Sequence, residues 1–188
     1  MSATVLIAIV VLVLAVGLFM SGAIPAVRTF FAFRGKRVVT CPETHKPVAV
    51  NVDVKEAAMG AFLKEPTLRL NQCTRWPERQ NCGQECLQQI EADPANCLVW
   101  NMVSKWYEGK NCVFCRKPIG HLHHLDHAPA LQAPDHKTIE WKRVRPEDLP
   151  EVFATHQPVC WNCHITEPFR RLHPELLVER EPEPKRMA

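Results

Sequence analysis

Two short cysteine pairs carry the residues of this sequence that are best suited to metal chemistry. They are Cys112-Val-Phe-Cys115 and Cys160-Trp-Asn-Cys163. A CxxC turn lets two thiolates bind one ion, and two such turns supply the four ligands of a closed tetrahedral site. We therefore expect a structural metal site made by Cys112, Cys115, Cys160 and Cys163. Zinc is the expected metal, although a rubredoxin-like iron would use the same ligands.

The residue after the second pair opens an alternative. Cys160-Trp-Asn-Cys163-His164 is also the pattern of covalent c-type haem attachment, with His164 as the axial ligand. In that case the protein would transfer electrons. The haem hypothesis leaves Cys112 and Cys115 without partners, so the four-sulfur site is the preferred interpretation.

Five more cysteines precede these pairs. The chain has nine in all, an odd number that excludes a complete disulfide framework. Cys82 and Cys86 would share one helix face if residues 82–91 are helical. We expect a possible second metal site at Cys41, Cys73, Cys82 and Cys86, while Cys97 is expected to be an ordinary buried thiol. Four thiolates suit zinc and an iron–sulfur cluster equally, and unliganded cysteines are the alternative.

The first 27 residues have the composition of a transmembrane anchor. Residues 3–26 carry no charge, and a bilayer core of ~30 Å needs about 20 apolar residues. No basic residue precedes them, which argues against a cleaved signal peptide. A basic juxtamembrane segment follows at 28–37, with Arg28, Arg34, Lys36 and Arg37. The positive-inside rule then predicts a single-pass protein in the lipid bilayer with a cytoplasmic domain, a periplasmic one being the alternative.

Apolar periodicity predicts an α+β protein after this anchor. We expect a cysteine-containing α+β region at 38–109, a metal-binding region at 110–178 and a disordered charged tail at 179–188. The expected elements are a hairpin at 37–54, a strand at 138–144, and helices at 55–64, 82–91, 97–106, 146–155 and 161–172. No internal repeat is evident beyond the two CxxC pairs.

The second region resembles a treble-clef, zinc-ribbon-like domain. A turn at Cys112, a hairpin and a helix that starts on the second pair follow the order of that fold over residues 110–173. The 44 residues between the pairs are more than the usual pattern has. The resemblance implies a structural zinc ion. The chain as a whole resembles bacterial membrane-anchored cysteine-rich proteins, which implies no particular activity.

The same region also resembles HNH-type nucleases, which build their site on a treble clef. That resemblance implies Asp126 and His127 as the Asp-His pair, with His127 as the general base and His156 helping to hold a divalent ion. The Asn-x-x-Lys that often follows the second pair is absent. A solvated loop is the simpler interpretation of the His-rich stretch, and metal capture by His123 and His127 requires them to lie one helical turn apart.

The charge balance bears on the partners. A net charge of +3 is small, so nucleic acid is not indicated as a partner. We expect a membrane-anchored scaffold or interaction protein with structural zinc and an unidentified protein partner, to which no reaction is assigned. Electron transfer, through a c-type haem or an iron–sulfur cluster, and an HNH-like nuclease are the second and third hypotheses.

Overall fold

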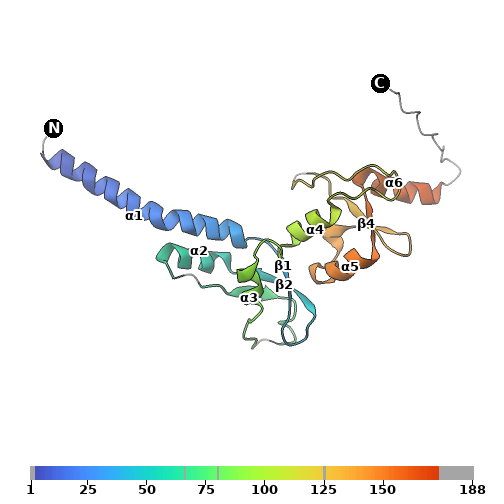
Figure 1. The fold of residues 1–188 in the computed structure, drawn as a ribbon, viewed down its shortest axis with the longest axis horizontal. Helices are drawn as coiled ribbons and strands as arrows, with labels where there is room; N and C mark the ends of the chain where they lie inside the picture. Colours follow the sequence, from blue (N-terminus) through green and yellow to red (C-terminus); the bar gives the residue numbers. More distant parts are fainter. Residues whose placement is uncertain (1–2, 66, 80, 125, 174–188) are drawn as a thin grey trace, which may run out of the picture. The chain divides into compact units, whose positions relative to one another are not determined.

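The computed structural model describes residues 3–65, 67–79, 81–124 and 126–173. Helices and sheets are both present, as expected for an α+β protein (Figure 1). The chain divides into two compact units. Unit 1 is Met1–Lys105 with Arg145–Pro150, and unit 2 is Trp106–Val144 with Glu151–Ala188. The tail predicted at 179–188 lies outside the described residues.

Unit 1 begins with the apolar helix α1, Ala3–Phe33. Its length and composition are sufficient to cross a membrane over Thr4–Phe33. The helix runs past the predicted anchor boundary at residue 27 and includes Arg28. It ends where Gly35 takes a φ of 102° and the buried Arg37 guanidinium donates hydrogen bonds to the carbonyls of Ala32, Phe33 and Gly35. Arg37 is therefore a helix cap rather than a free surface charge.

Helix α2, Val54–Leu63, lies beside α1 (Figure 1). Asp53 caps its first turn by accepting hydrogen bonds from the backbone N–H groups of Lys55 and Glu56, as an N-cap aspartate does. The rings of Phe19 and Phe62 meet edge to face with centroids 6.0 Å apart. Gly22 permits this approach, since a Cβ there would lie 2.9 Å from the Phe62 ring.

A three-stranded antiparallel sheet forms the centre of unit 1, in the order β1-β2-β3. The strands are β1, Arg37–Thr40; β2, Pro47–Val52; and β3, Leu70–Cys73. The hairpin predicted at 37–54 is thus confirmed. Alternating valines bury their side chains, and Val39, Val48 and Val50 pack with Leu70 and with Ile90 of helix α3, Leu87–Ala92.

Two helix predictions in unit 1 need correction. Helix α3 covers only Leu87–Ala92, so Cys82 lies outside it and does not share a helix face with Cys86. The reason is local, because Gln84 adopts a φ of 56°, which no helix interior accepts. Helix α4, Val99–Tyr107, begins later than expected, and Asn96 instead donates its backbone N–H to the Asp93 carboxylate at 3.0 Å.

Unit 2 contains a second three-stranded antiparallel sheet, in the order β5-β4-β6. Its strands are β4, Ala130–Gln132; β5, Thr138–Glu140; and β6, Gln157–Val159. The strand predicted at 138–144 is shorter because Trp141–Arg143 forms a 3-10 turn, η1. A further 3-10 turn, η2, Pro146–Asp148, precedes α5, Leu149–Thr155, and α6 covers Trp161–Leu172 as predicted.

The core of unit 2 is built around strand β4. Ala130 and Leu131 are fully buried, as is Val159 on β6. The Tyr107 hydroxyl, also buried, donates a 2.8 Å hydrogen bond to the carbonyl of Ala130. This bond satisfies a polar group that would be costly to bury alone. The sheet thus gives α6 and the preceding loop a rigid support.

Candidate metal centre

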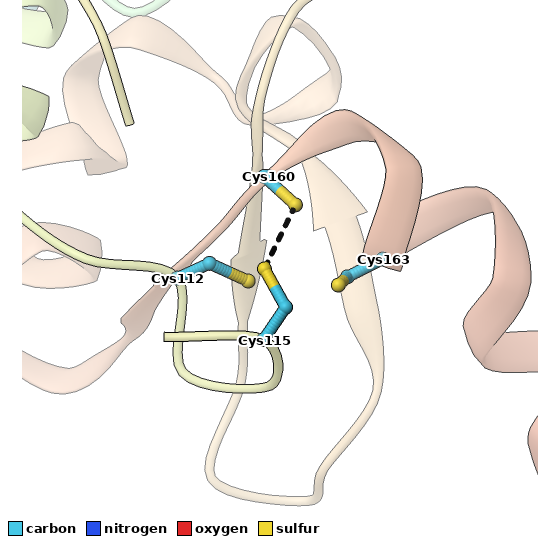
Figure 2. A group of neighbouring side chains, drawn as sticks. All are labelled: Cys112, Cys115, Cys160 and Cys163. Atoms are coloured by element: carbon cyan, nitrogen blue, oxygen red, sulfur yellow. Dashed lines mark hydrogen bonds between the residues drawn. The ribbon is translucent and has the colours of Figure 1, made fainter. Parts of the chain in front are cut away.

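Four sulfur atoms converge in unit 2. The Sγ atoms of Cys112, Cys115, Cys160 and Cys163 all lie within 4.8 Å of one another and point toward a common centre (Figure 2). The Cys115 and Cys160 sulfurs are 3.8 Å apart. Bonds of about 2.3 Å to a tetrahedral ion would separate any two sulfurs by roughly 3.8 Å. The cluster therefore has the size and the ligand number of a single metal site, as the two CxxC pairs predicted.

A tight turn places the first pair. The Cys112 N–H donates to the carbonyl of Lys117 at 2.9 Å, and the Arg116 N–H donates to the carbonyl of Cys112 at 2.9 Å. Arg116 has a φ of 61°, which bends the chain back after Cys115. The turn is held against β6 by a 3.0 Å bond from the Val113 N–H to the carbonyl of Pro158. Two sequence-distant pairs are thereby brought together.

The start of helix α6 places the second pair. Cys160 is its N-cap residue, and Cys163 lies in its first turn. The positive end of the helix dipole and the unpaired N–H groups of that turn favour a negatively charged sulfur. Cys112 and Cys163 are buried, while Cys115 and Cys160 are half-buried. The site is thus largely closed to water, as structural metal sites usually are.

The pKa of Cys112 is shifted in the opposite direction from those of Cys160 and Cys163. Burial would raise the pKa of Cys112, but the backbone N–H groups of Cys115, Cys160 and Phe114 outweigh it and lower this pKa to about 7. Burial raises the pKa of Cys160 and of Cys163, and the neighbouring sulfurs raise that of Cys163 further. Crowding four acidic thiols costs free energy once more than one is charged. A bound cation removes that cost.

His164, the axial ligand of the haem hypothesis, has another role in this structure. Its Nδ1 lies 2.8 Å from the Thr138 hydroxyl and its Nε2 lies 4.0 Å from the Glu140 carboxylate. These contacts tie α6 to β5. Thr138 is a partner that sequence reasoning did not single out, and no spacing rule links it to His164.

The residues of the nuclease resemblance do not gather into a site. The His127 ring stacks on Trp161 with centroids 4.8 Å apart, and His156 Nδ1 lies 2.8 Å from the hydroxyl of neighbouring Thr155. The described residues around His123 and His127 are not helical, so that pair does not lie one turn apart on a helix. Within the described parts of the chain, the four-cysteine cluster is the one group of three or more potential ligands whose donor atoms are already gathered this tightly.

The second predicted set lies together in unit 1, around a cavity of about 90 Å³ that Cys41, Cys73, Cys82 and Cys86 all line. Their sulfurs are less closely gathered than those of the first cluster. Burial would raise the pKa of Cys41, but hydrogen bonds from Thr44, the Glu43 N–H and Arg75 lower it to about 7. Arg75 is a contact that sequence reasoning missed, although it follows Cys73 by only two residues.

Cys97 lies apart from both sets. Its sulfur is 3.7 Å from the carbonyl of Gln89, and it is half-buried beside the core of unit 1.

Comparison of the chain with protein-family models, with curated proteins and with solved structures found no match. The cysteine geometry and helix α1 are therefore the features of the chain that indicate a function.

Proposed function

We propose that Cys112, Cys115, Cys160 and Cys163 hold a structural zinc ion in a treble-clef-like arrangement. The observation that carries the proposal is the convergence of four sulfurs within 4.8 Å. The turn with the first two cysteines is followed along the chain by the β4–β5 hairpin and later by helix α6, whose start carries the last two, which is the order of that fold. Four thiolates with no open coordination position favour zinc in a structural role over a catalytic one.

We further propose that the protein is a membrane-anchored scaffold or interaction protein. Helix α1 is long and apolar enough to span a bilayer. In unit 2, α6 exposes Ile165, Phe169 and Leu172, which are spaced at about one helical turn and share one face. Apolar side chains grouped on an exposed face are typical of surfaces that contact another molecule. This supports an interaction role and assigns no reaction.

The four-sulfur arrangement is favoured over haem attachment. Thioether bonds to haem would remove the Cys160 and Cys163 sulfurs from the cluster and leave Cys112 buried without a partner. Electron transfer through a c-type haem is therefore the weaker hypothesis.

Metal analysis of the full chain in detergent tests the zinc proposal. We expect zinc in the purified protein, and we expect Cys163→Ser to remove one equivalent while the matched control Cys97→Ser keeps it. Retention of all metal by Cys163→Ser would contradict the assignment. A sharp Soret band that persists after acid–acetone extraction would instead establish covalent haem.

A further inference from the structure

The turn at Cys41 in unit 1 has the same construction as the metal-binding turn in unit 2. The sequences are Cys41-Pro-Glu-Thr-His-Lys-Pro47 and Cys112-Val-Phe-Cys-Arg-Lys-Pro118. Cysteine, lysine and proline occupy the same positions in both turns. A basic side chain precedes the lysine in each, His45 in the first turn and Arg116 in the second. The prediction of no internal repeat beyond the CxxC pairs is thus wrong. The likeness is hidden in the sequence because the first turn has Thr44 where the second has Cys115.

Two backbone hydrogen bonds are the same in both turns. The Cys41 N–H donates to the carbonyl of Lys46 at 2.9 Å, as the Cys112 N–H does to that of Lys117 at 2.9 Å. The His45 N–H donates to the carbonyl of Cys41 at 2.8 Å, which corresponds to the 2.9 Å bond between Arg116 and Cys112.

The backbone angles and the strand pairing match as well. The φ angles of His45 and Arg116 are 54° and 61°. The residue before each cysteine pairs with the proline that ends the turn, Thr40 with Pro47 and Asn111 with Pro118. Non-glycine residues rarely adopt such a φ, so its recurrence at the same place indicates one specific turn used twice.

Thr44 stands where the metal-binding turn has its second cysteine, Cys115. A site at Cys41 therefore needs its other ligands from elsewhere in unit 1. Strand β3 delivers Cys73, which pairs with Val50 of β2. Cys86 is the N-cap residue of α3, the position that Cys160 holds on α6. With Cys82, these residues line the same cavity as Cys41.

Hydrogen-bond donors around this cavity point at sulfur. The Arg75 guanidinium lies 3.1 Å from Cys41 Sγ, and the Gln84 N–H lies 3.4 Å from Cys82 Sγ. Arg79 also lines the cavity. Cationic and N–H groups of this kind offset the negative charge of several thiolates around one centre.

We propose that Cys41, Cys73, Cys82 and Cys86 form a second thiolate metal centre in unit 1. The ligand is a thiophilic metal, either one ion or an iron–sulfur cluster. These sulfurs surround the cavity more loosely than the first cluster surrounds its centre. In an iron–sulfur cluster the thiolates lie farther apart than around one ion, because iron and sulfide atoms lie between them. A single ion would instead draw the four sulfurs closer together.

The test is metal and acid-labile sulfide analysis of the anaerobically purified full chain in detergent, with an absorption spectrum. We expect two centres in the unaltered protein. Cys86→Ser should lose the second and keep the first, Cys163→Ser should do the reverse, and Cys97→Ser should keep both. Iron with sulfide and broad visible absorption identifies a cluster, and colourless protein with a second zinc identifies a single ion; either outcome supports the site.

Mass-spectrometric mapping of cysteine alkylation on the unaltered chain covers the case in which Cys86→Ser does not fold. Cys41, Cys73, Cys82 and Cys86 should be protected until a chelator is added, while Cys97 should react equally with and without chelator. A chain that holds one centre, lost in Cys163→Ser and kept in Cys86→Ser, would overturn the second site and leave the zinc proposal intact. A single centre that is lost only in Cys86→Ser would support the second site and contradict the zinc proposal.

Discussion

Cys112 differs from Cys160 and Cys163 in its affinity for a proton. Backbone N–H groups lower its pKa to about 7, whereas burial raises the pKa of Cys160 and Cys163. Near neutral pH the metal-free cluster therefore holds Cys112 partly ionised beside the protonated thiols of Cys160 and Cys163. A metal ion must displace the remaining protons, because the thiolate is the form that binds.

Metal affinity at the first centre should therefore rise with pH. The thiols with raised pKa stay protonated up to alkaline pH, so binding releases their protons throughout the range from 6.5 to 8. Each proton released strengthens binding about tenfold per pH unit. Competition with a chromophoric chelator, corrected for that chelator's own protonation, measures this slope. An affinity that is constant over this range would contradict the assignment of thiol ligands.

Arg37 has a structural role that the other basic residues near the end of α1 do not share. Its side chain is buried, with a relative exposure of 0%, and it donates to carbonyls at the end of α1. Burial lowers its pKa, yet the group stays cationic because an arginine pKa starts above 12.

Substitution of Arg37→Met should lower the free energy of unfolding of unit 1 by about 2 kcal/mol, since partly buried carbonyl groups at the end of α1 lose their donor. The matched control is Arg34→Met, which removes an exposed guanidinium three residues earlier and should have little effect. Denaturant titration of the full chain in detergent compares the two. Equal midpoints for both variants would refute the capping role.

At the scale of elements, sequence pattern predicted best where apolar periodicity and turn chemistry agreed. Helix α6 and the β1–β2 hairpin follow directly from such agreement. The helix expected at 82–91 failed because Gln84 takes a left-handed conformation, which its residue type does not announce. The convergence of the four cysteines of the first cluster could be predicted from CxxC spacing. The likeness of the Cys41 turn is evident only from its backbone hydrogen bonds, because Thr44 stands in the place of a second cysteine.

At Gly60 of helix α2, packing should outweigh the intrinsic preference of a helix for alanine over glycine. Alanine is favoured over glycine in a helix by about 1 kcal/mol. A Cβ on Gly60, however, would lie 2.5 Å from the carbonyl oxygen of Glu65, so the backbone after the helix would have to move.

We expect Gly60→Ala to destabilise unit 1 by about 1–2 kcal/mol, the usual scale of overpacking. Gly17→Ala is the control, since a Cβ there meets nothing within 4 Å on helix α1; it should be neutral or mildly stabilising. Thermal unfolding followed by circular dichroism measures both. A Gly60→Ala variant as stable as the unaltered chain would show that the Glu65 carbonyl gives way freely.

At the scale of the whole molecule, the proposed topology depends on few charges. With Arg37 buried as a cap, the exposed basic residues near the end of α1 are Arg28, Arg34 and Lys36. Positive charges beside a membrane helix favour the cytoplasmic side. Reduced cysteines suited to metal binding also belong to that compartment.

A reporter fused after Ala188 should therefore be active if it works only in the cytoplasm, and inactive if it works only in the periplasm. Substitution of Arg28, Arg34 and Lys36 by glutamine should weaken this preference, whereas Arg37→Gln should leave it unchanged while destabilising the fold. Periplasmic reporter activity in the unaltered protein would overturn the orientation.

If α1 spans the bilayer as proposed, the contact between Gly22 and Phe62 sets the depth at which helix α2 meets the lipid. Gly22 lies 19 residues after Ala3, which at 1.5 Å per residue is roughly 30 Å along α1, about the thickness of the hydrocarbon core. Helix α2 would then lie at the headgroup level, with its exposed Met59 and Leu63 available to the lipid. Removing α1 to obtain a water-soluble fragment would uncover Phe62, and such a fragment should self-associate.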